Sequence, residues 1–96
     1  MIRAVLPASN KRRLSAFIIE PGIEHEAMGA DHPGDELIYV LEGALTVDFP
    51  DRSVSLEQGD CVHFDGHLRH QLVKVGTIPT RALIIIGQDI SLQPEV

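Results

Sequence analysis

The chain has 96 residues, 44% of them hydrophobic, which is room for one small domain with one core and excludes separate catalytic and regulatory domains. Its formal net charge of −6 at pH 7 repels phosphate backbones and anionic lipids, so we expect no direct nucleic-acid binding by this domain and no membrane partner. No apolar run is long enough for a membrane span or a signal-peptide core, which predicts a cytoplasmic protein.

Short apolar runs, separated by glycine and proline turns at intervals of about ten residues, predict an all-β sandwich or barrel. No segment has the pattern of a helix. The Pro50-Asp51 pair predicts a hairpin, because proline presets one turn angle and aspartate favours turns. The first ten residues and the tail after Gly87 lack a sustained pattern. The expected strands are 14–20, 36–41, 44–49, 52–56, 60–64, 70–75 and 81–86.

Two of these strands carry apolar residues on both faces, at 37–41 and 82–86. A small β-sandwich has one interior, so something outside the monomer is expected to cover the second face. We therefore predict a homodimer built on that outer face, with Tyr39 on it. Cys61 is the only cysteine, which excludes an intramolecular disulfide, and its apolar surroundings predict a small buried side chain.

Strand alternation predicts that Glu36 points into the interior together with Ile38 and Val40. A buried carboxylate must be paired, hydrogen-bonded, protonated or bound to a metal, because a lone buried charge is too costly. In the strand 70–75 the same rule places His70 and Lys74 on one face. If that face is also inward, both can meet Glu36, and a Lys–Glu pair competes with a metal.

Five histidines are many for so short a chain. His63, His67 and His70 have a spacing that would line one helix face and bind zinc, but Gly66 interrupts the segment and the flanking runs are strands. We therefore expect these three not to share a face. His63 is expected to be packed or hydrogen-bonded, His67 to face solvent in a turn, and His25 to lie on the surface.

The stretch "HPGDELIYVLEG" followed by "LEQGDCVHFDGHLRH" resembles the two motifs of the cupin family. Cupins are β-barrels of the double-sheet jelly-roll class. Their motifs, G-x5-H-x-H-x(3–4)-E-x6-G and G-x5-P-x-G-x2-H-x3-N, bind a metal at the barrel centre. The resemblance covers about 17–86 and implies one cupin domain over 1–96, with a barrel core of about 14–87. The matching residues are His32, Glu36, Gly43, Gly59 and His70.

Several motif positions differ in this sequence. Ala30 stands where the family has its other histidine, and Glu24 where it has the opening glycine. In the second motif, Asp65, His67 and Lys74 replace the proline, the internal glycine and the asparagine. The resemblance therefore leaves at most three metal ligands. Two histidines and one carboxylate suit non-haem iron, and a three-ligand zinc site is conceivable, so the resemblance implies Fe, Mn, Ni or Zn if a metal is bound.

The sequence is most similar to the cupin domain at the C-terminal end of helix-turn-helix regulators of the Xre type, which is taken to sense a small ligand. The resemblance thus implies a small-molecule sensor of a regulator type. Glu36 and His70 would anchor the ligand, His32 would lie at the rim, and Lys74 would pair with an anion. The alternative is a metal-dependent cupin enzyme, a dioxygenase or isomerase, with His32, Glu36 and His70 as ligands. A third possibility is a piece of a longer regulator.

Overall fold

The computed structural model describes residues 2–6, 14–22 and 32–87, and over these ranges the chain is built from strands and turns. No helix in this part of the chain is long and apolar enough to cross a membrane. The strands are β1 (Ile2–Leu6), β2 (Leu14–Ile19), β3 (Asp35–Glu42), β4 (Ala44–Phe49), β5 (Arg52–Glu57), β6 (Cys61–Asp65), β7 (Gln71–Lys74) and β8 (Arg81–Gly87).

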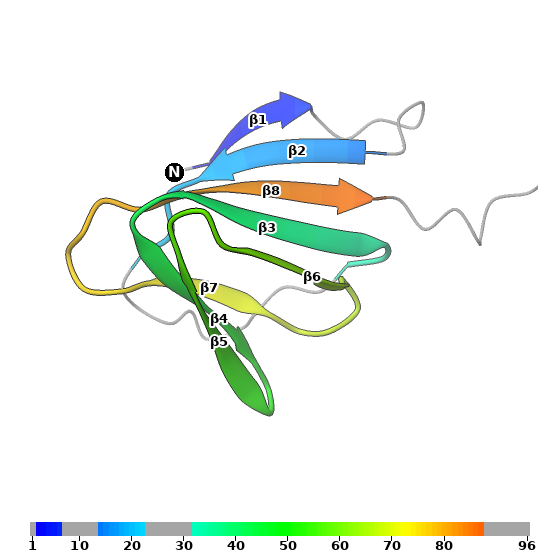
Figure 1. Cartoon of the computed structure of the whole chain (residues 1–96). Helices are drawn as coiled ribbons and strands as arrows, with labels where there is room; N and C mark the ends of the chain where they lie inside the picture. The colour runs from blue at the N-terminus through cyan, green and yellow to red at the C-terminus, as the bar shows by residue number, and fades with distance from the viewer. Residues whose placement is uncertain (1, 7–13, 23–31, 88–96) are drawn as a thin grey trace, which may run out of the picture.

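The strands form two antiparallel sheets that face each other (Figure 1). The larger sheet has the order β1-β2-β8-β3-β6, and the smaller one β5-β4-β7. β8 lies between β2 and β3, so strands far apart in the sequence are neighbours. This double-sheet arrangement is a jelly roll, which confirms the predicted all-β fold class.

Each of the expected strands occurs, with its ends within one residue of the predicted bounds. The strand that sequence reasoning missed is β1, which pairs with β2 at the edge of the larger sheet. The side chains of residues 2–5 are all exposed. A strand with both faces exposed needs no alternation of apolar and polar residues, so its sequence carries no periodic signal.

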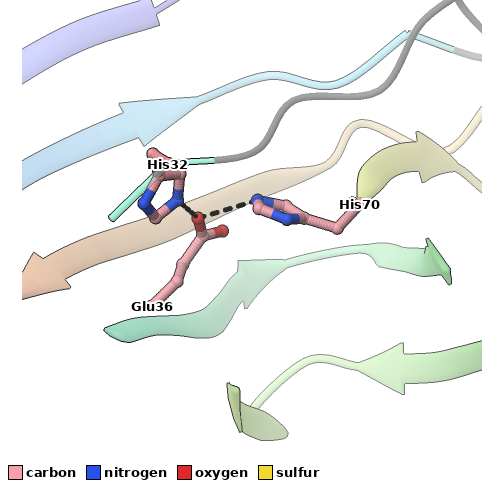
Figure 2. A group of neighbouring side chains, drawn as sticks. All are labelled: His32, Glu36 and His70. Atoms are coloured by element: carbon pink, nitrogen blue, oxygen red, sulfur yellow. Dashed lines mark hydrogen bonds and ion pairs between the residues drawn. The ribbon is translucent and has the colours of Figure 1, made fainter. Parts of the chain in front are cut away.

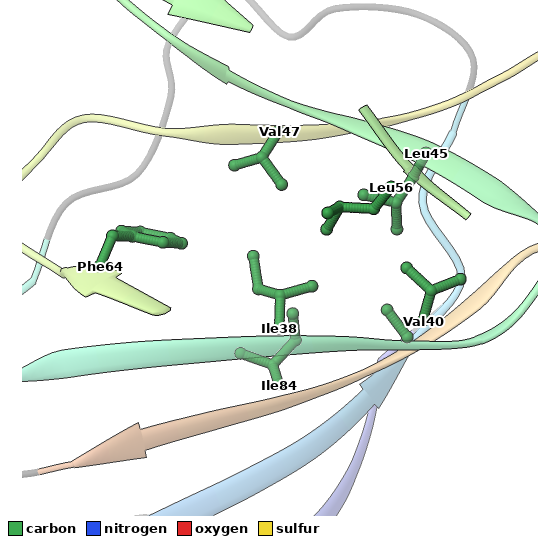
Figure 3. Packing of buried hydrophobic residues seen from close by; sticks show 8 residues of the cluster. Ile38, Val40, Leu45, Val47, Leu56, Phe64 and Ile84 are labelled. Carbon is green, nitrogen blue, oxygen red and sulfur yellow. The ribbon is translucent and has the colours of Figure 1, made fainter. Parts of the chain in front are cut away.

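The core lies between the two sheets (Figure 3). Ile38 and Val40 of β3 meet Leu45 and Val47 of β4, and all four side chains are fully buried. Burial of an aliphatic side chain of this size contributes about 1.5–3 kcal/mol each. The predicted inward direction of residues 36, 38 and 40 is therefore confirmed, and it carries Glu36 into the interior together with its apolar neighbours.

The outer face of the larger sheet is also apolar. Tyr39 lies on it, 39% exposed, in a row with Leu83 of β8 and Cys61 of β6. The outward direction of Tyr39 is as predicted, but the prediction that Cys61 is buried is wrong. Val62 takes the inward position opposite Ile38, so strand alternation turns Cys61 to the exposed outer face.

The turns follow the sequence signals. Pro50 and Asp51 form the two-residue connection between Phe49 and Arg52, which confirms the predicted hairpin. Gly43 joins β3 to β4 with a φ of +80°, a conformation that favours glycine. A Cβ at this position would also lie within 2.3 Å of the hydroxyl oxygen of a buried threonine, so a side chain does not fit.

Candidate metal centre

Glu36 is the buried carboxylate of the larger sheet. It stands on β3 between Phe64 of β6 and Ile86 of β8, and it is only 3% exposed. Both flanking side chains are apolar and offer its carboxylate no hydrogen bond. A carboxylate in such a place requires partners from another part of the chain, because an isolated buried charge costs several kcal/mol or more.

Two histidines supply those partners. The Nε2 atom of His32 lies 2.6 Å from Glu36 Oε1, and the Nε2 atom of His70 lies 2.9 Å from the same oxygen (Figure 2). His32 comes from the loop before β3, and His70 directly precedes β7 in the opposite sheet. The two rings meet edge to face, with centroids 5.3 Å apart. Three residues that the sequence analysis proposed as a site thus converge on one point.

The other ring nitrogens contact backbone carbonyl oxygens. His70 Nδ1 lies 2.5 Å from the Leu68 carbonyl oxygen, and His32 Nδ1 lies 3.2 Å from the Pro33 carbonyl oxygen. A carbonyl oxygen only accepts, so each Nδ1 carries the hydrogen and donates it. A carboxylate oxygen also only accepts, so without a metal a hydrogen lies between each Nε2 and Glu36 Oε1. A metal ion bound by the Nε2 atoms would replace these hydrogens and leave the contacts of Nδ1 with the carbonyls unchanged.

These donors fit a divalent metal ion. The ligand atoms of His32, Glu36 and His70 all lie within 4.8 Å of one another. Metal–ligand bonds of about 2.1 Å place neighbouring ligand atoms about 3.0–3.4 Å apart in octahedral or tetrahedral geometry. The contacts at 2.6 and 2.9 Å need to lengthen by about 0.1–0.8 Å, and ligand atoms that lie up to 4.8 Å apart need to approach each other. Imidazole and carboxylate ligands suit iron, zinc, nickel and manganese, and three of them leave coordination positions open.

The site is enclosed on one side by aromatic rings. Phe64 contacts the His70 ring edge to face, with centroids 4.7 Å apart. Phe49 contacts Phe64 edge to face, with centroids 5.0 Å apart. The side chains of Glu36 and His70 are each 4% exposed, whereas that of His32 is 21% exposed. His32 is therefore the most exposed of the three side chains.

Lys74 is not part of this cluster. It does face inward, opposite Leu45, but it lies at the far end of β7. There it lines a cavity of about 440 Å³ with Glu42 and Arg81. Glu42 ends β3 about 20 Å from Glu36, at about 3.3 Å per residue. The alternative of a pair between Lys74 and Glu36 in place of a metal is therefore wrong. Strand alternation predicts which face of the sheet Lys74 lies on, but only the strand register determines which residues it lies beside.

His63 and His67 lie outside the centre. His63 is exposed on the outer face, where its Nε2 is 3.2 Å from an oxygen of Asp35, and His67 is exposed in the turn after β6. The exposure of His67 is as predicted, whereas His63 is exposed rather than packed, and no helix carries these two residues. His25 and Ala30 lie outside the described residues.

Sequence reasoning missed the short turn that supports both site histidines. The main-chain N–H of His32 donates to the Gly66 carbonyl at 2.9 Å, and the Leu68 carbonyl accepts from His70. The motif alignment assigned the glycine position of the second motif to His67, one residue beyond Gly66. Shifting that alignment by one residue would have placed Gly66 at the glycine position and identified the turn.

Comparison with known proteins places the chain in a family. Its sequence matches the model of the cupin domain over residues 15–86, most of the chain. A comparison with curated proteins finds no significant match.

Solved structures share the fold. A transcriptional regulator of the HTH_3 family from Vibrio cholerae superposes with a TM-score of 0.76 at 26% identity, over 98% of this chain and 51% of the regulator. This chain thus spans about half the length of that regulator. The cupin domain of an XRE family transcriptional regulator from Enterobacter cloacae gives 0.75 at 18% identity, covering 99% and 97%. The Fe(II) form of HppE with its substrate gives 0.74 at 15% identity, covering 88% and 52%.

Proposed function

The chain belongs to the cupin family, and on this premise we propose that it is a ligand-sensing domain in which His32, Glu36 and His70 hold a divalent metal ion that anchors a small anionic molecule. The observation that carries the proposal is the convergence of both Nε2 atoms on Glu36 Oε1 in the barrel interior. The sequence favoured a pocket without a metal, whereas the contacts of both histidines with Glu36 support a three-ligand metal centre.

The charge of the centre supports an anionic ligand. A divalent ion held by one carboxylate and two neutral imidazoles retains about one positive charge. The protein as a whole carries a net charge of −6, which disfavours anions elsewhere on its surface. A carboxylate that enters from the His32 side can take the open metal positions and neutralise the local charge.

The regulator assignment is supported by the comparison with the Vibrio cholerae protein. The two are 26% identical over 98% of this chain, and this chain covers 51% of that regulator. We propose that the cupin domain serves the same purpose in both, as the part that responds to a small molecule. The similarity to the Enterobacter cloacae domain, at 18% identity, supports the shared fold alone.

Metal analysis and ligand titration test this function. Protein purified without a metal-binding tag and dialysed against Fe(II), Mn(II), Ni(II) or Zn(II) is expected to retain about one ion per chain by elemental analysis. His32→Ala and His70→Ala should each weaken metal binding strongly, so that less than one ion per chain is retained, and His63→Ala and His67→Ala, which alter exposed histidines, should not. Oxalate added to the Co(II)-loaded protein should change its visible spectrum. Wild-type protein that retains no metal would refute the proposal.

An enzyme is the second candidate. Two histidines and one carboxylate with open positions are the ligand set of non-haem Fe(II) oxygenases, and the fold is shared with Fe(II) HppE. At 15% identity, that similarity concerns the fold alone. Oxygen uptake by the Fe(II)-loaded protein separates the two functions. Sustained uptake that depends on an added small acid and is lost in His70→Ala favours an enzyme, whereas binding of oxalate without uptake favours a sensor.

A further inference from the structure

We propose that Gly66 is a positioning residue of the metal centre: the absence of a side chain at residue 66 allows the His32 ring to reach Glu36. The inference rests on the proposed metal binding and names a residue outside the three ligands. Gly66 lies in the turn between β6 and β7, and it is buried.

The His32 ring occupies the space that a side chain at residue 66 would need. A Cβ built on Gly66 would lie 2.2 Å from His32 Cε1 and 2.4 Å from His32 Nδ1. Real Cβ atoms essentially never approach other heavy atoms so closely. The φ angle of Gly66 is not in the left-handed region, unlike that of Gly34, Gly43, Gly59 and Gly76. Glycine is therefore required here by the imidazole and its surroundings, and not by the conformation of residue 66 itself.

Backbone hydrogen bonds hold the two segments in this close contact. The His32 N–H donates to the Gly66 carbonyl at 2.9 Å, and the Gly66 N–H donates to the Gly34 carbonyl at 2.8 Å. Two residues further on, the Leu68 carbonyl accepts the Nδ1 hydrogen of His70. One short turn thus sets the position of His32 through its backbone and the tautomer of His70 through a carbonyl. Groups that orient metal ligands in this way commonly change metal affinity when altered.

Gly66→Ala separates positioning from folding in a double-mutant cycle. The added methyl displaces the His32 ring, and because it would also lie 2.5 Å from the Gly34 carbonyl oxygen, some loss of thermal stability is expected with or without His32. Metal affinity should respond differently. Against wild-type His32, Gly66→Ala should weaken Co(II) binding by about 10–100-fold. In a His32→Ala background it should have no further effect, because the ring that it displaces is absent.

Gly22→Ala is the matched control, because a Cβ there meets nothing within 4 Å and its φ is not in the left-handed region. It should leave Co(II) affinity unchanged. Equal Co(II) affinity of Gly66→Ala and wild type, or equal losses in both backgrounds, would overturn the positioning role alone. A wild-type chain that binds no Co(II) would overturn the metal centre as well.

A measurement on the unaltered chain decides the matter if Gly66→Ala does not fold. In the Zn(II)-loaded wild-type protein the Hε1 proton of His32 should show a strong nuclear Overhauser effect to an α-proton of Gly66, since the ring lies against that face of the glycine. Absence of this effect in a protein with one bound zinc would place the ring elsewhere and refute the proposal.

Discussion

Replacement of Glu36 by glutamine should remove most of the increase in Tm that metal binding produces. The side chain is buried, and one of its oxygens is the point on which both Nε2 atoms converge. Glu36→Gln keeps the size of the side chain but removes the anionic ligand of the three. Changes in groups that merely orient ligands cost about 10–100-fold in metal affinity, so loss of a ligand should cost at least about 100-fold.

The expected size of the metal-dependent shift in Tm follows from the linkage between metal binding and unfolding. At a free metal concentration of 100 times the wild-type Kd, binding adds about 2.7 kcal/mol to the free energy of unfolding. For a domain of about this size each kcal/mol raises Tm by about 4–8 °C, which predicts a shift of about 10–20 °C. In Glu36→Gln the same concentration only equals the weakened Kd, so the gain falls to about 0.4 kcal/mol and the shift to about 2–3 °C.

Thermal unfolding followed by circular dichroism, with Zn(II) and with a chelator, measures both shifts. Each variant is compared with its own metal-free form, so a change in intrinsic stability cancels. Glu42→Gln makes the same chemical change at the exposed end of the same strand and should keep the wild-type shift. If Glu36→Gln also keeps it, Glu36 is not a metal ligand, and the convergence of the two histidines has another cause.

Three further results are expected. Ile38→Ala removes a fully buried side chain and should lower the free energy of unfolding by about 2–5 kcal/mol in urea, while Ile78→Ala, at a 57% exposed position, should leave it nearly unchanged. Gly43→Ala combines a φ of +80° with a Cβ 2.3 Å from a threonine oxygen and should lower Tm more than Gly76→Ala, whose Cβ meets nothing within 4 Å. Light scattering should give twice the chain mass of 10.5 kDa if the outer face forms the predicted homodimer. Tyr39→Glu should shift the protein toward monomer. A wild-type monomer at working concentration would contradict the dimer.

Local pattern was sufficient for β2 to β8 and for the direction of most of their side chains, but not for β1. The alternation rule depends only on the pleat of one strand, so it placed Ile38 and Val40 in the core and Tyr39 on the outer face before any partner strand was known. The same rule identified Glu36 as a buried charge that needs partners. The motif resemblance added His32 and His70, which the structure brings to Glu36.

Other features required distances between segments that are remote in the sequence. His70, directly before β7, and Lys74 share a face, but the register of β7 against β4 places Lys74 opposite Leu45 and beside Glu42, away from Glu36. Cys61 looked buried from its apolar neighbours, yet its pairing opposite Tyr39 exposes it.

The sequence by itself determined the all-β class and strands β2 to β8, and it selected the three residues of the candidate centre, because these depend on local periodicity and on short motifs. Only the tertiary structure decided which partners Glu36 has, and that Gly66 makes room for His32. Contacts between side chains depend on register and on the packing of two sheets, and neither is encoded in the periodicity of a single strand.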